Sequence, residues 1–394
     1  MIYGKSSTIE QCLSSRYGRL STSQAEIMGL SKDLLVKHCE AKSNKKLFVP
    51  QQYWDYHYYS SRKEHSLDTF KVNDEFQYNS RNTPCSSSYK PKDSTQTSIW
   101  MFGGSTILNS ETSDEYTISN ELCKLYQPKE VEVLNLGVGG FHSEIQTMKL
   151  LNLYKLSTFN EKTPKKPDIV IFYDGFNDSS KLFTRTNVTG IQQDLSAKIS
   201  ASINDSASIP KIKMAYWSLK YLSSIAYFVA DGKQNLISRA FDKLSNNFVL
   251  DSMLENPLVS NPIPTKSLST TLIEAKSYIH DQKILRALCN GIKIKCYVFL
   301  QPILATRLNP VGEIESSVHN ELSNKNRIQN AKNFYEIVSN EIDDLNNTPF
   351  YKIFDISDMF NGHELRQIPV FYDYGHTGFF SSKFIAKEMF DRIN

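Results

Sequence analysis

The chain has 394 residues, of which 40% are hydrophobic, 12% aromatic and 22% charged, a composition typical of a globular protein and not of a disordered chain. Its formal net charge is only +3, and its Lys and Arg residues are scattered rather than clustered, which gives no reason to expect nucleic-acid binding. The length would suit two or three average domains, but a single α/β domain with insertions also reaches it.

The cysteines show neither a CxxC pair nor the spacing of a zinc site, so we expect free thiols in a reducing compartment. The first residues lack the basic-then-apolar layout of a signal peptide, and no run of about eighteen apolar residues follows. The sequence therefore predicts a cytoplasmic protein without stable membrane insertion. The six cysteines are Cys12, Cys39, Cys85, Cys123, Cys289 and Cys296.

Residues 1–97 are predicted to form an aromatic-rich N-terminal extension. It contains the Tyr-rich stretch 53–59 and the stretch 76–81, whose aromatic density favours packing on a domain over a flexible tail. Residues 83–97 are mostly Ser, Pro, Lys and Thr, which is typical of a surface linker. We therefore place the main domain at residues 98–394.

The first half of this domain alternates apolar runs with helical patterns. The strands expected at 98–102, 131–136 and 169–173 each break into a glycine-containing turn. A helix is expected at 113–125, and a second helix should place Ile145, Met148 and Leu151 on one face.

The second half begins with residues 180–290, which show helical periodicity and no strand-like alternation, and we interpret them as a helical insertion. Within it, residues 214–230 are the most apolar stretch, and their lysine and serines favour a docked helix over membrane contact. The remaining elements predicted are strands at 293–300 and 350–356 and helices at 324–345 and 381–393, the last with Phe384, Ile385, Met389 and Phe390 toward the core.

Strands that are largely apolar and alternate with helices predict a parallel sheet between two helical layers. In such sheets the reacting groups collect beyond the carboxyl ends of the strands. Ser105, Gly140 and Asn177 each follow one of the first three strands. Taken singly, each stretch is also explained as a simple strand-ending turn, but together they indicate a site.

Acyl transfer by a serine needs a neighbouring base and donors aimed at the oxyanion. His376 has the best surroundings of the eight histidines, because Asp373 lies three residues before it and can orient the ring. A surface loop is the alternative explanation for this Asp-x-x-His pair.

Four stretches in this order resemble the four blocks of the SGNH (GDSL-type) hydrolases: Gly103-Gly104-Ser105-Thr106, residues 135–140, residues 175–178 and residues 373–376. The resemblance covers the chain from residue 98 to its end except the insertion. It implies a flavodoxin-like three-layer α/β/α fold with a five-stranded parallel sheet. It also implies that Ser105 is the nucleophile, that His376 is the base with Asp373 as its partner, and that Ser105, Gly140 and Asn177 form the oxyanion hole. Gly140 is favoured over Gly139 because it stands at the family's position before the helix.

The first block departs from the family's usual Gly-Asp-Ser, since Gly104 stands where an acid is common. The Gly-Gly-Ser-Thr form resembles a branch associated with bacterial surface polysaccharides, whose members tend to carry a similar preamble. This resemblance favours an acetyl ester on a carbohydrate as the substrate.

Other residues invite separate interpretations. Asp174 and Asp178 flank Asn177 and could form a glycosidase-like carboxylate pair, but Asp178 resembles the family's structural acid. His142 is a possible pocket residue or a surface residue at a helix start. Gln301 is a possible substrate contact or a cap of its strand end.

The sequence thus predicts a serine esterase that acts on an acylated small molecule or saccharide. No metal and no nucleotide cofactor is implied, because the hydroxyl, the imidazole and the amide donors supply every role. Two alternatives stay open, an O-acetyltransferase with the same site and a catalytically silent carbohydrate-binding protein. The oligomeric state is left undetermined.

Overall fold

The computed structural model describes residues 52–54, 58–60, 72–75, 78–85, 96–109, 112, 114–127, 131–159, 164–179, 268–323, 326–362 and 365–394. The strands β1 (Gln52–Trp54) and β2 (Tyr58–Ser60) pair antiparallel as a separate two-stranded sheet, and they fall in the Tyr-rich stretch of the N-terminal extension.

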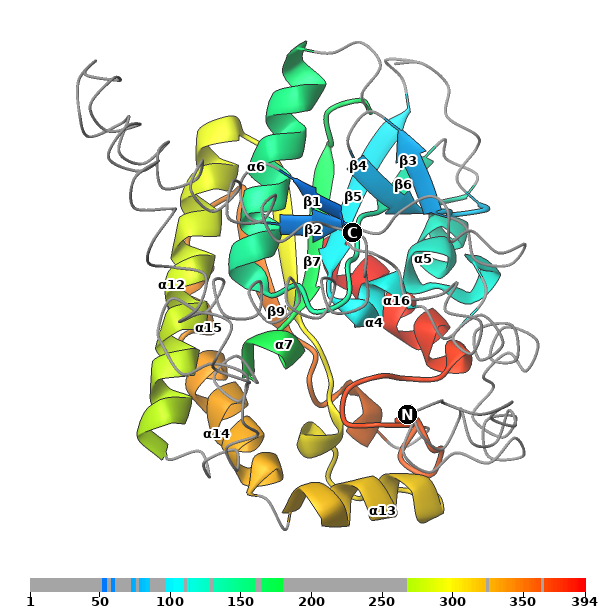
Figure 1. Cartoon of the computed structure of the whole chain (residues 1–394), viewed down its shortest axis with the longest axis vertical. Coiled ribbons are helices and arrows are strands. Elements are labelled where there is room, and N and C mark those ends of the chain that lie inside the picture. Colours follow the sequence, from blue (N-terminus) through cyan, green and yellow to red (C-terminus); the bar gives the residue numbers. More distant parts are fainter. Residues whose placement is uncertain are drawn as a thin grey trace, which may run out of the picture. The chain divides into compact units, whose positions relative to one another are not determined.

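The central sheet has seven strands in the order β3-β4-β6-β5-β7-β8-β9 (Figure 1). The five strands from β6 to β9 are parallel, which confirms the predicted parallel sheet. Two antiparallel strands that we did not predict extend its β6 edge. The strands are β3 (Val72–Glu75), β4 (Tyr78–Arg81), β5 (Thr97–Gly103), β6 (Val131–Asn135), β7 (Ile169–Asp174), β8 (Lys295–Leu300) and β9 (Tyr351–Asp355).

The parallel part has the flavodoxin-like strand order, because the first parallel strand, β5, lies between the second, β6, and the third, β7. The chain leaves β5 toward one edge of the sheet and then returns to build the other edge. In open α/β sheets the crevice at such a switch point is where ligands bind. The turns that follow β5, β6 and β7 therefore lie at the expected position of a site.

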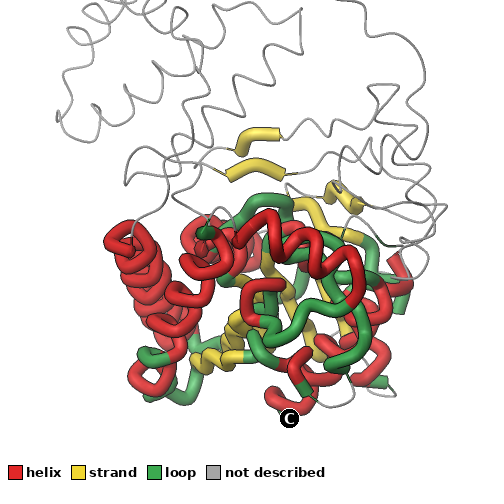
Figure 2. Tube along the Cα trace, turned by 90° about the horizontal axis from the view of Figure 1, so that it is seen from below, coloured by secondary structure: helices red, strands yellow, loops and turns green. Residues whose placement is uncertain are grey.

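Helices cover both faces of the sheet (Figures 1 and 2). The side chains of β5 alternate between the faces, as the pleat of a strand requires. Trp100 and Phe102 pack in one core cluster with α6 (Ser143–Phe159), α12 (Leu268–Ile292) and α14 (Arg327–Ser339). Ile99 and Met101 pack in the other with α5 (Ile118–Tyr126) and α16 (Phe379–Ile393).

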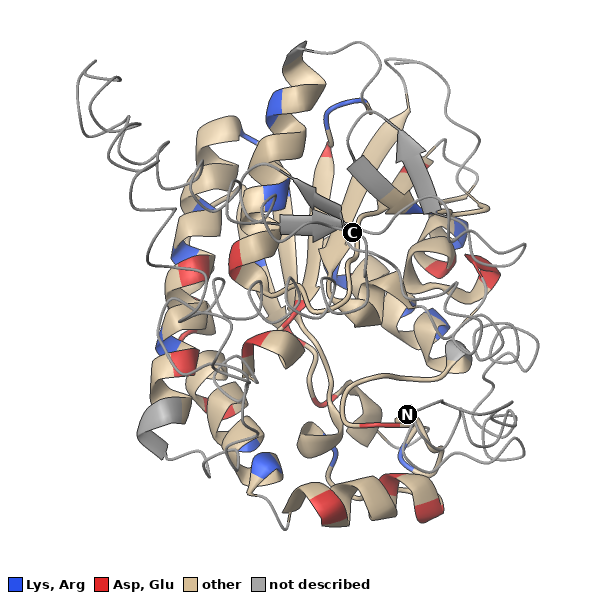
Figure 3. Ribbon diagram, in the orientation of Figure 1, with Lys and Arg blue, Asp and Glu red and all other residues tan. Residues whose placement is uncertain are grey.

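Short helices connect these elements. They are α4 (Ser105–Leu108), α7 (Phe176–Ser179), α13 (Gly312–Ser323), α15 (Ile342–Leu345) and the 3-10 turns at Asp114–Tyr116, Leu304–Thr306 and Met359–Asn361. Acidic and basic side chains are interspersed over the described helices (Figure 3).

Of the helical insertion predicted at 180–290, only the last part lies within the described residues. That part is α12, which connects β7 to β8 and packs in the core with α6 and α14, so it is a flanking helix of the fold. Residues 180–267, including the apolar stretch 214–230, lie outside the described residues. The helix predicted at 324–345 is also interrupted, since α14 ends at Ser339 and α15 begins at Ile342.

The expected buried face of α6 is partly wrong. Ile145 is buried, but Leu151 is half exposed. The face that packs on the sheet carries Gln146, Lys149 and Leu150, all of them buried. A lysine there breaks the apolar pattern, because its long stem packs like an aliphatic chain while its ammonium group needs a partner.

The expectation of free thiols is wrong for the described cysteines, which form two disulfides. Cys85 is bonded to Cys123, and Cys289 to Cys296, with Cα atoms 5.9 and 6.2 Å apart. Cys12 and Cys39 lie outside the described residues. The cytoplasmic location stays a prediction. None of the described helices combines the length and apolar character needed to span a membrane.

Candidate active site

Ser105, His376 and Asp373 form one chain of hydrogen bonds. Ser105 is the first residue of α4, directly after β5, and its Oγ lies 2.6 Å from Nε2 of His376. Nδ1 of the same ring lies 2.7 Å from Oδ2 of Asp373. The structure therefore brings together the three residues predicted as a triad, although Ser105 and His376 are 271 positions apart.

The carboxylate of Asp373 is held by its own loop. Its Oδ1 accepts hydrogen bonds from the backbone N–H groups of Gly375, at 2.9 Å, and His376, at 2.7 Å. Burial alone would raise the pKa of Asp373, but the charge and hydrogen bonds of His376 and the N–H of Gly375 outweigh it and lower that pKa. An ionised Asp373 favours the tautomer with the proton on Nδ1, which turns the basic Nε2 toward Ser105.

The turn between β5 and α4 is tight enough to require glycine. A Cβ on Gly103 would lie 2.5 Å from Cγ1 of Ile107 and 2.9 Å from the carbonyl oxygen of Tyr173. Close packing of α4 on the ends of β5 and β7 thus fixes where Ser105 starts its helix.

Asn177 lies on α7, beside the residue that precedes Ser105. A Cβ on Gly104 would be only 2.3 Å from Nδ2 of Asn177, so the amide fills the space that a side chain at 104 would need. The same Nδ2 donates a 2.7 Å hydrogen bond to the carbonyl oxygen of Phe141. This bond ties the turn after β7 to the turn after β6.

Gly140 belongs to the turn after β6. The N–H of Val138 donates to the carbonyl oxygen of Gly103 at 3.0 Å, which sets this turn against the end of β5. Gly140 has φ of 81°, in the left-handed region that favours glycine, whereas Gly139 has ordinary φ and open space where a Cβ would be. The assignment of Gly140 rather than Gly139 to the oxyanion hole stays a prediction.

All four blocks meet at the carboxyl end of a sheet with flavodoxin-like order. The chain is similar to the SGNH (GDSL-type) hydrolases. Models of known protein families gave no match to the sequence, and no curated protein matched it either.

Several solved structures resemble the chain. A lipolytic protein of the G-D-S-L family from Desulfitobacterium hafniense is 10% identical with a TM-score of 0.35, and the match covers 75% of this chain and 98% of that one. An acetylxylan esterase from Geobacillus stearothermophilus is 10% identical with a TM-score of 0.36, covering 76% and 94%. A further acetyl xylan esterase is 12% identical with a TM-score of 0.34, covering 75% and 100%.

The two acidic residues beside Asn177 have hydrogen-bond partners inside the domain. Asp178 accepts hydrogen bonds from the backbone N–H of Ser143 and, at 2.6 Å, from its hydroxyl. These bonds join α6 to the turn after β7. Asp174 accepts from the hydroxyl of Tyr278 at 2.6 Å, and burial, followed by the charge of Asp178, raises its pKa well above the ordinary value. Both carboxyls are buried, at 3% and 0% exposure, so they are not placed to flank a glycosidic bond as the paired acids of a glycosidase do.

His142 and Gln301 are both only 2% exposed. His142 immediately precedes α6, so it stands at a helix start but not at the surface. Oε1 of Gln301 accepts a 3.1 Å hydrogen bond from the hydroxyl of Thr106, the residue after Ser105. The side chain of Gln301 therefore contacts α4 from inside the protein.

Aromatic rings that we did not predict surround His376. The ring of Phe176 lies 5.9 Å from the imidazole and 5.5 Å from the ring of Tyr374, while Tyr372 stacks on the imidazole at 5.8 Å. Phe176 and Tyr374 are partly exposed, whereas Tyr372 is buried. The sequence held one indication that Phe176 lies near the site, because it stands between Gly175 and Asn177 in the third block.

Within the described ranges, no three His, Cys, Asp or Glu side chains are grouped so that they could hold a metal ion.

Proposed function

We propose that this protein is a serine esterase that hydrolyses an acyl ester, in the first instance an acetyl ester on a carbohydrate. The observation that carries the proposal is the chain of hydrogen bonds from Ser105 Oγ through His376 to Asp373, with distances of 2.6 and 2.7 Å. A hydroxyl, a base and an orienting carboxylate in this order are the components of nucleophilic acyl transfer.

In the first half of the reaction, Nε2 of His376 takes the proton of Ser105 while Oγ attacks the carbonyl carbon of the ester. The tetrahedral intermediate places a negative charge on the former carbonyl oxygen. His376 then gives its proton to the leaving alcohol, and the acyl group stays on Ser105. Asp373 remains ionised throughout and stabilises the imidazolium.

The oxyanion is assigned to the space in front of Gly104. The N–H groups of Ser105 and Gly140 and the amide of Asn177 are its donors in this proposal. The support is that the Asn177 amide lies against Gly104 and that the turn of Gly140 is bonded to Gly103 through Val138. Donors fixed before the reaction stabilise the transition state more than the ground state.

In the second half of the reaction, His376 takes a proton from water while the water oxygen attacks the acyl carbon. The bond between that carbon and Oγ then breaks, His376 returns the proton to Oγ of Ser105, and the acid leaves. A sugar hydroxyl in place of water would make the protein an O-acetyltransferase, with the same residues in the same roles.

The carbohydrate part of the proposal is supported by the rings of Phe176 and Tyr374. They are partly exposed beside His376, and the C–H faces of sugars pack well on aromatic rings. The Gly-Gly-Ser-Thr form of the first block, similar to that of polysaccharide-associated relatives, favours the same class of substrate.

The test is a panel of p-nitrophenyl esters of increasing chain length, with Ser105→Ala as the blank, followed by acetylated oligosaccharides. Among the p-nitrophenyl esters, we expect the acetyl ester to be hydrolysed fastest. We also expect the rate of acetic acid release to be independent of any added acceptor. Release that is negligible alone and rises with an oligosaccharide acceptor, with acetylated sugar detected by mass, would establish the transferase instead. No turnover of any ester would favour the silent binding protein.

A further inference from the structure

Arg81 is the last residue of β4 and lies in the segment that we assigned to the N-terminal extension. In the structure it pairs with Asn135, the last residue of β6, in the antiparallel register. Its side chain is fully buried, although an arginine carries a charge that normally stays in water. A buried guanidinium needs specific partners, and these show what it does.

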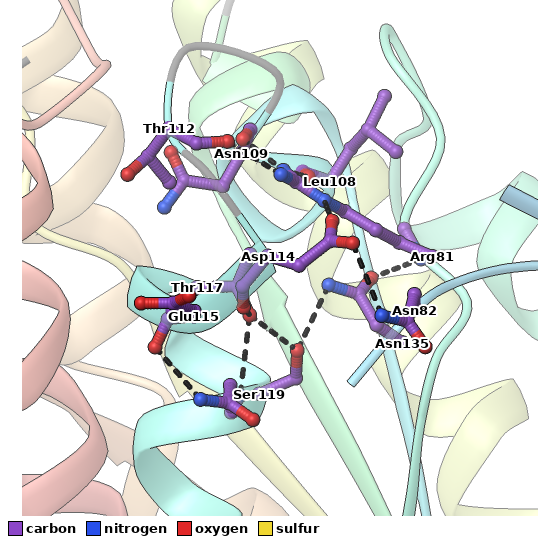
Figure 4. Close-up of polar contacts among 12 residues, drawn as sticks. Arg81, Asn82, Leu108, Asn109, Thr112, Asp114, Glu115, Thr117, Ser119 and Asn135 are labelled. Atoms are coloured by element: carbon purple, nitrogen blue, oxygen red, sulfur yellow. Dashed lines mark hydrogen bonds and ion pairs between the residues drawn. The ribbon is translucent and has the colours of Figure 1, made fainter. Parts of the chain in front are cut away.

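All three nitrogens of the Arg81 guanidinium group donate hydrogen bonds (Figure 4). Its Nε donates to Oδ1 of Asp114 at 2.9 Å. One terminal nitrogen donates to the carbonyl oxygens of Leu108 and Asn109, and the other to the carbonyl oxygen of Thr112. One side chain therefore binds a carboxylate and three backbone carbonyls.

Those carbonyls belong to the C-terminal end of α4 and the segment that follows. The last carbonyls of any helix lack partners within the helix, and α4 has only one turn. The carbonyl oxygen of Ile107 accepts from Nδ2 of Asn135 at 2.8 Å. Asn135 and Arg81, neighbours across β6 and β4, together satisfy the carbonyls of three consecutive residues from Ile107 to Asn109.

The same end of α4 is directly bonded to the nucleophile residue. The N–H of Asn109 donates to the carbonyl oxygen of Ser105 at 2.7 Å. Asn109 has φ of 49°, in the left-handed region, a conformation that needs support from its surroundings in a residue other than glycine. Its carbonyl oxygen is one of those held by Arg81. The guanidinium is thus two hydrogen bonds away from the backbone of Ser105.

We propose that Arg81 is a positioning residue for Ser105, and that residues 78–85 are a structural part of the active site. The inference rests on the proposed function, because it needs Ser105 to be the nucleophile. Arg81 holds the single turn of α4 from its C-terminal end, while the tight turn at Gly103 holds the other end. The disulfide between Cys85 and Cys123 fastens the same segment to α5.

A lysine cannot take over this role. The guanidinium presents donors in a fixed plane, which matches carbonyls on several sides, whereas an ammonium group is a compact point charge on a flexible stem. Arg81→Lys therefore retains the charge and the partner Asp114 but loses most of the carbonyl contacts. Misplacing a reacting group by about 1 Å can cost roughly 100-fold in rate.

The experiment compares Arg81→Lys and Arg81→Ala with Arg392→Ala in the full chain. Arg392 is the matched control, since it also pairs with a carboxylate, Glu388, but its side chain is half exposed on α16. Hydrolysis of p-nitrophenyl acetate gives kcat and KM, and the rate of inactivation by a fluorophosphonate probe reports on Ser105 directly. All rates are measured well below each variant's melting temperature.

We expect Arg81→Lys to lower kcat and the inactivation rate by roughly 100-fold with KM little changed, and Arg392→Ala to match the wild type. If Arg81→Ala folds, a low, non-denaturing concentration of guanidinium chloride should restore part of the rate, and sodium chloride should not. If Arg81→Ala does not fold, the test is made with the kcat and inactivation rates of Arg81→Lys and Asp114→Asn. Wild-type kcat and inactivation rate in a folded Arg81→Lys protein would overturn the inference and show that the residue serves stability alone.

A crystal structure of Arg81→Lys separates this inference from the proposed function. We expect a displaced end of α4 and an Oγ of Ser105 beyond hydrogen-bond reach of His376. An unchanged 2.6 Å contact would overturn the inference even if the protein is an esterase. A wild-type protein without any turnover would instead overturn the proposed function, and the displacement of α4 would still be measured.

Discussion

The amide of Asn177 occupies the space that a side chain on Gly104 would need, with Nδ2 only 2.3 Å from the position of an ideal Cβ. In this chain, where Gly104 replaces the family's usual acid, the amide takes up the space of the missing side chain. With Asn177 in this position, the residue before Ser105 has to be glycine. The two residues are therefore coupled, and a substitution at Gly104 should displace the side chain of Asn177.

Gly104→Ala should push the Asn177 amide away from Ser105 and lower kcat by roughly 10²-fold, because a misplaced oxyanion donor is nearly as damaging as a missing one. Gly291→Ala is the control, since no atom lies within 4 Å of a Cβ at that position. Kinetics with p-nitrophenyl acetate decide the matter. An alanine at 104 that leaves kcat unchanged would show that the amide does not act on the reacting oxygen.

Asn177→Ala should lower kcat by roughly 10²–10³-fold with a smaller effect on KM. Its amide also bonds Phe141, so thermal melting has to be measured beside the kinetics. An increase in KM alone would mean that Asn177 binds the substrate and not the oxyanion.

Asp373→Asn should be damaging without removing the base itself. The carboxylate holds the tautomer of His376, and the lowered pKa of Asp373 keeps it ionised through neutral and mildly acidic pH. His376→Ala alone and His376→Ala combined with Asp373→Asn should lower kcat by about the same factor, because the effects of residues that act as a unit are not additive. Independent, additive losses from the two substitutions would argue against a functional Asp373–His376 pair.

Lys149 should make the protein's stability depend on pH. Burial lowers the pKa of Lys149 to about 7, while its ammonium has a single 2.9 Å hydrogen bond, to the carbonyl oxygen of Leu136, among the contacts described. The unfolded chain then binds more protons between pH 7 and pH 10, so the Lys149 contribution to the free energy of unfolding rises with pH across this range.

The variant Lys149→Met removes this contribution. Its free energy of unfolding relative to wild type should fall by about 2–3 kcal/mol between pH 7 and pH 9, at about 1.4 kcal/mol for each pH unit. Denaturant titrations at the two pH values measure the difference. A difference that does not change with pH would mean that Lys149 keeps an ordinary pKa in the folded protein.

The parallel strands could be predicted from the sequence because each is a short, largely apolar run, and the first three end at a glycine-containing turn. Ser105, Asn177 and His376 could be placed at one end of the sheet for the same reason, since parallel strands bring their carboxyl ends together. The apolar alternation along β5, with Trp100 and Phe102 on one face and Ile99 and Met101 on the other, agrees with both helical layers.

The rest depended on contacts that only the folded chain defines. β4 is four residues long, and Arg81 has no local signal that it will be buried, because its partners lie near residues 108–114. The disulfide between Cys85 and Cys123 requires Cα atoms 5.9 Å apart, which no spacing in the sequence reveals. α12 resembled an insertion because its long amphipathic pattern does not show that it covers the sheet.

The central claim is that Ser105 becomes acylated. It is tested most directly by quenching the wild-type protein during turnover of p-nitrophenyl acetate, digesting it and locating the added group by mass spectrometry. We predict one acetyl group on the peptide that contains Ser105, and none in Ser105→Ala. Turnover that persists in Ser105→Ala, or an acetyl group confined to another residue while Ser105 stays unmodified, would contradict the claim.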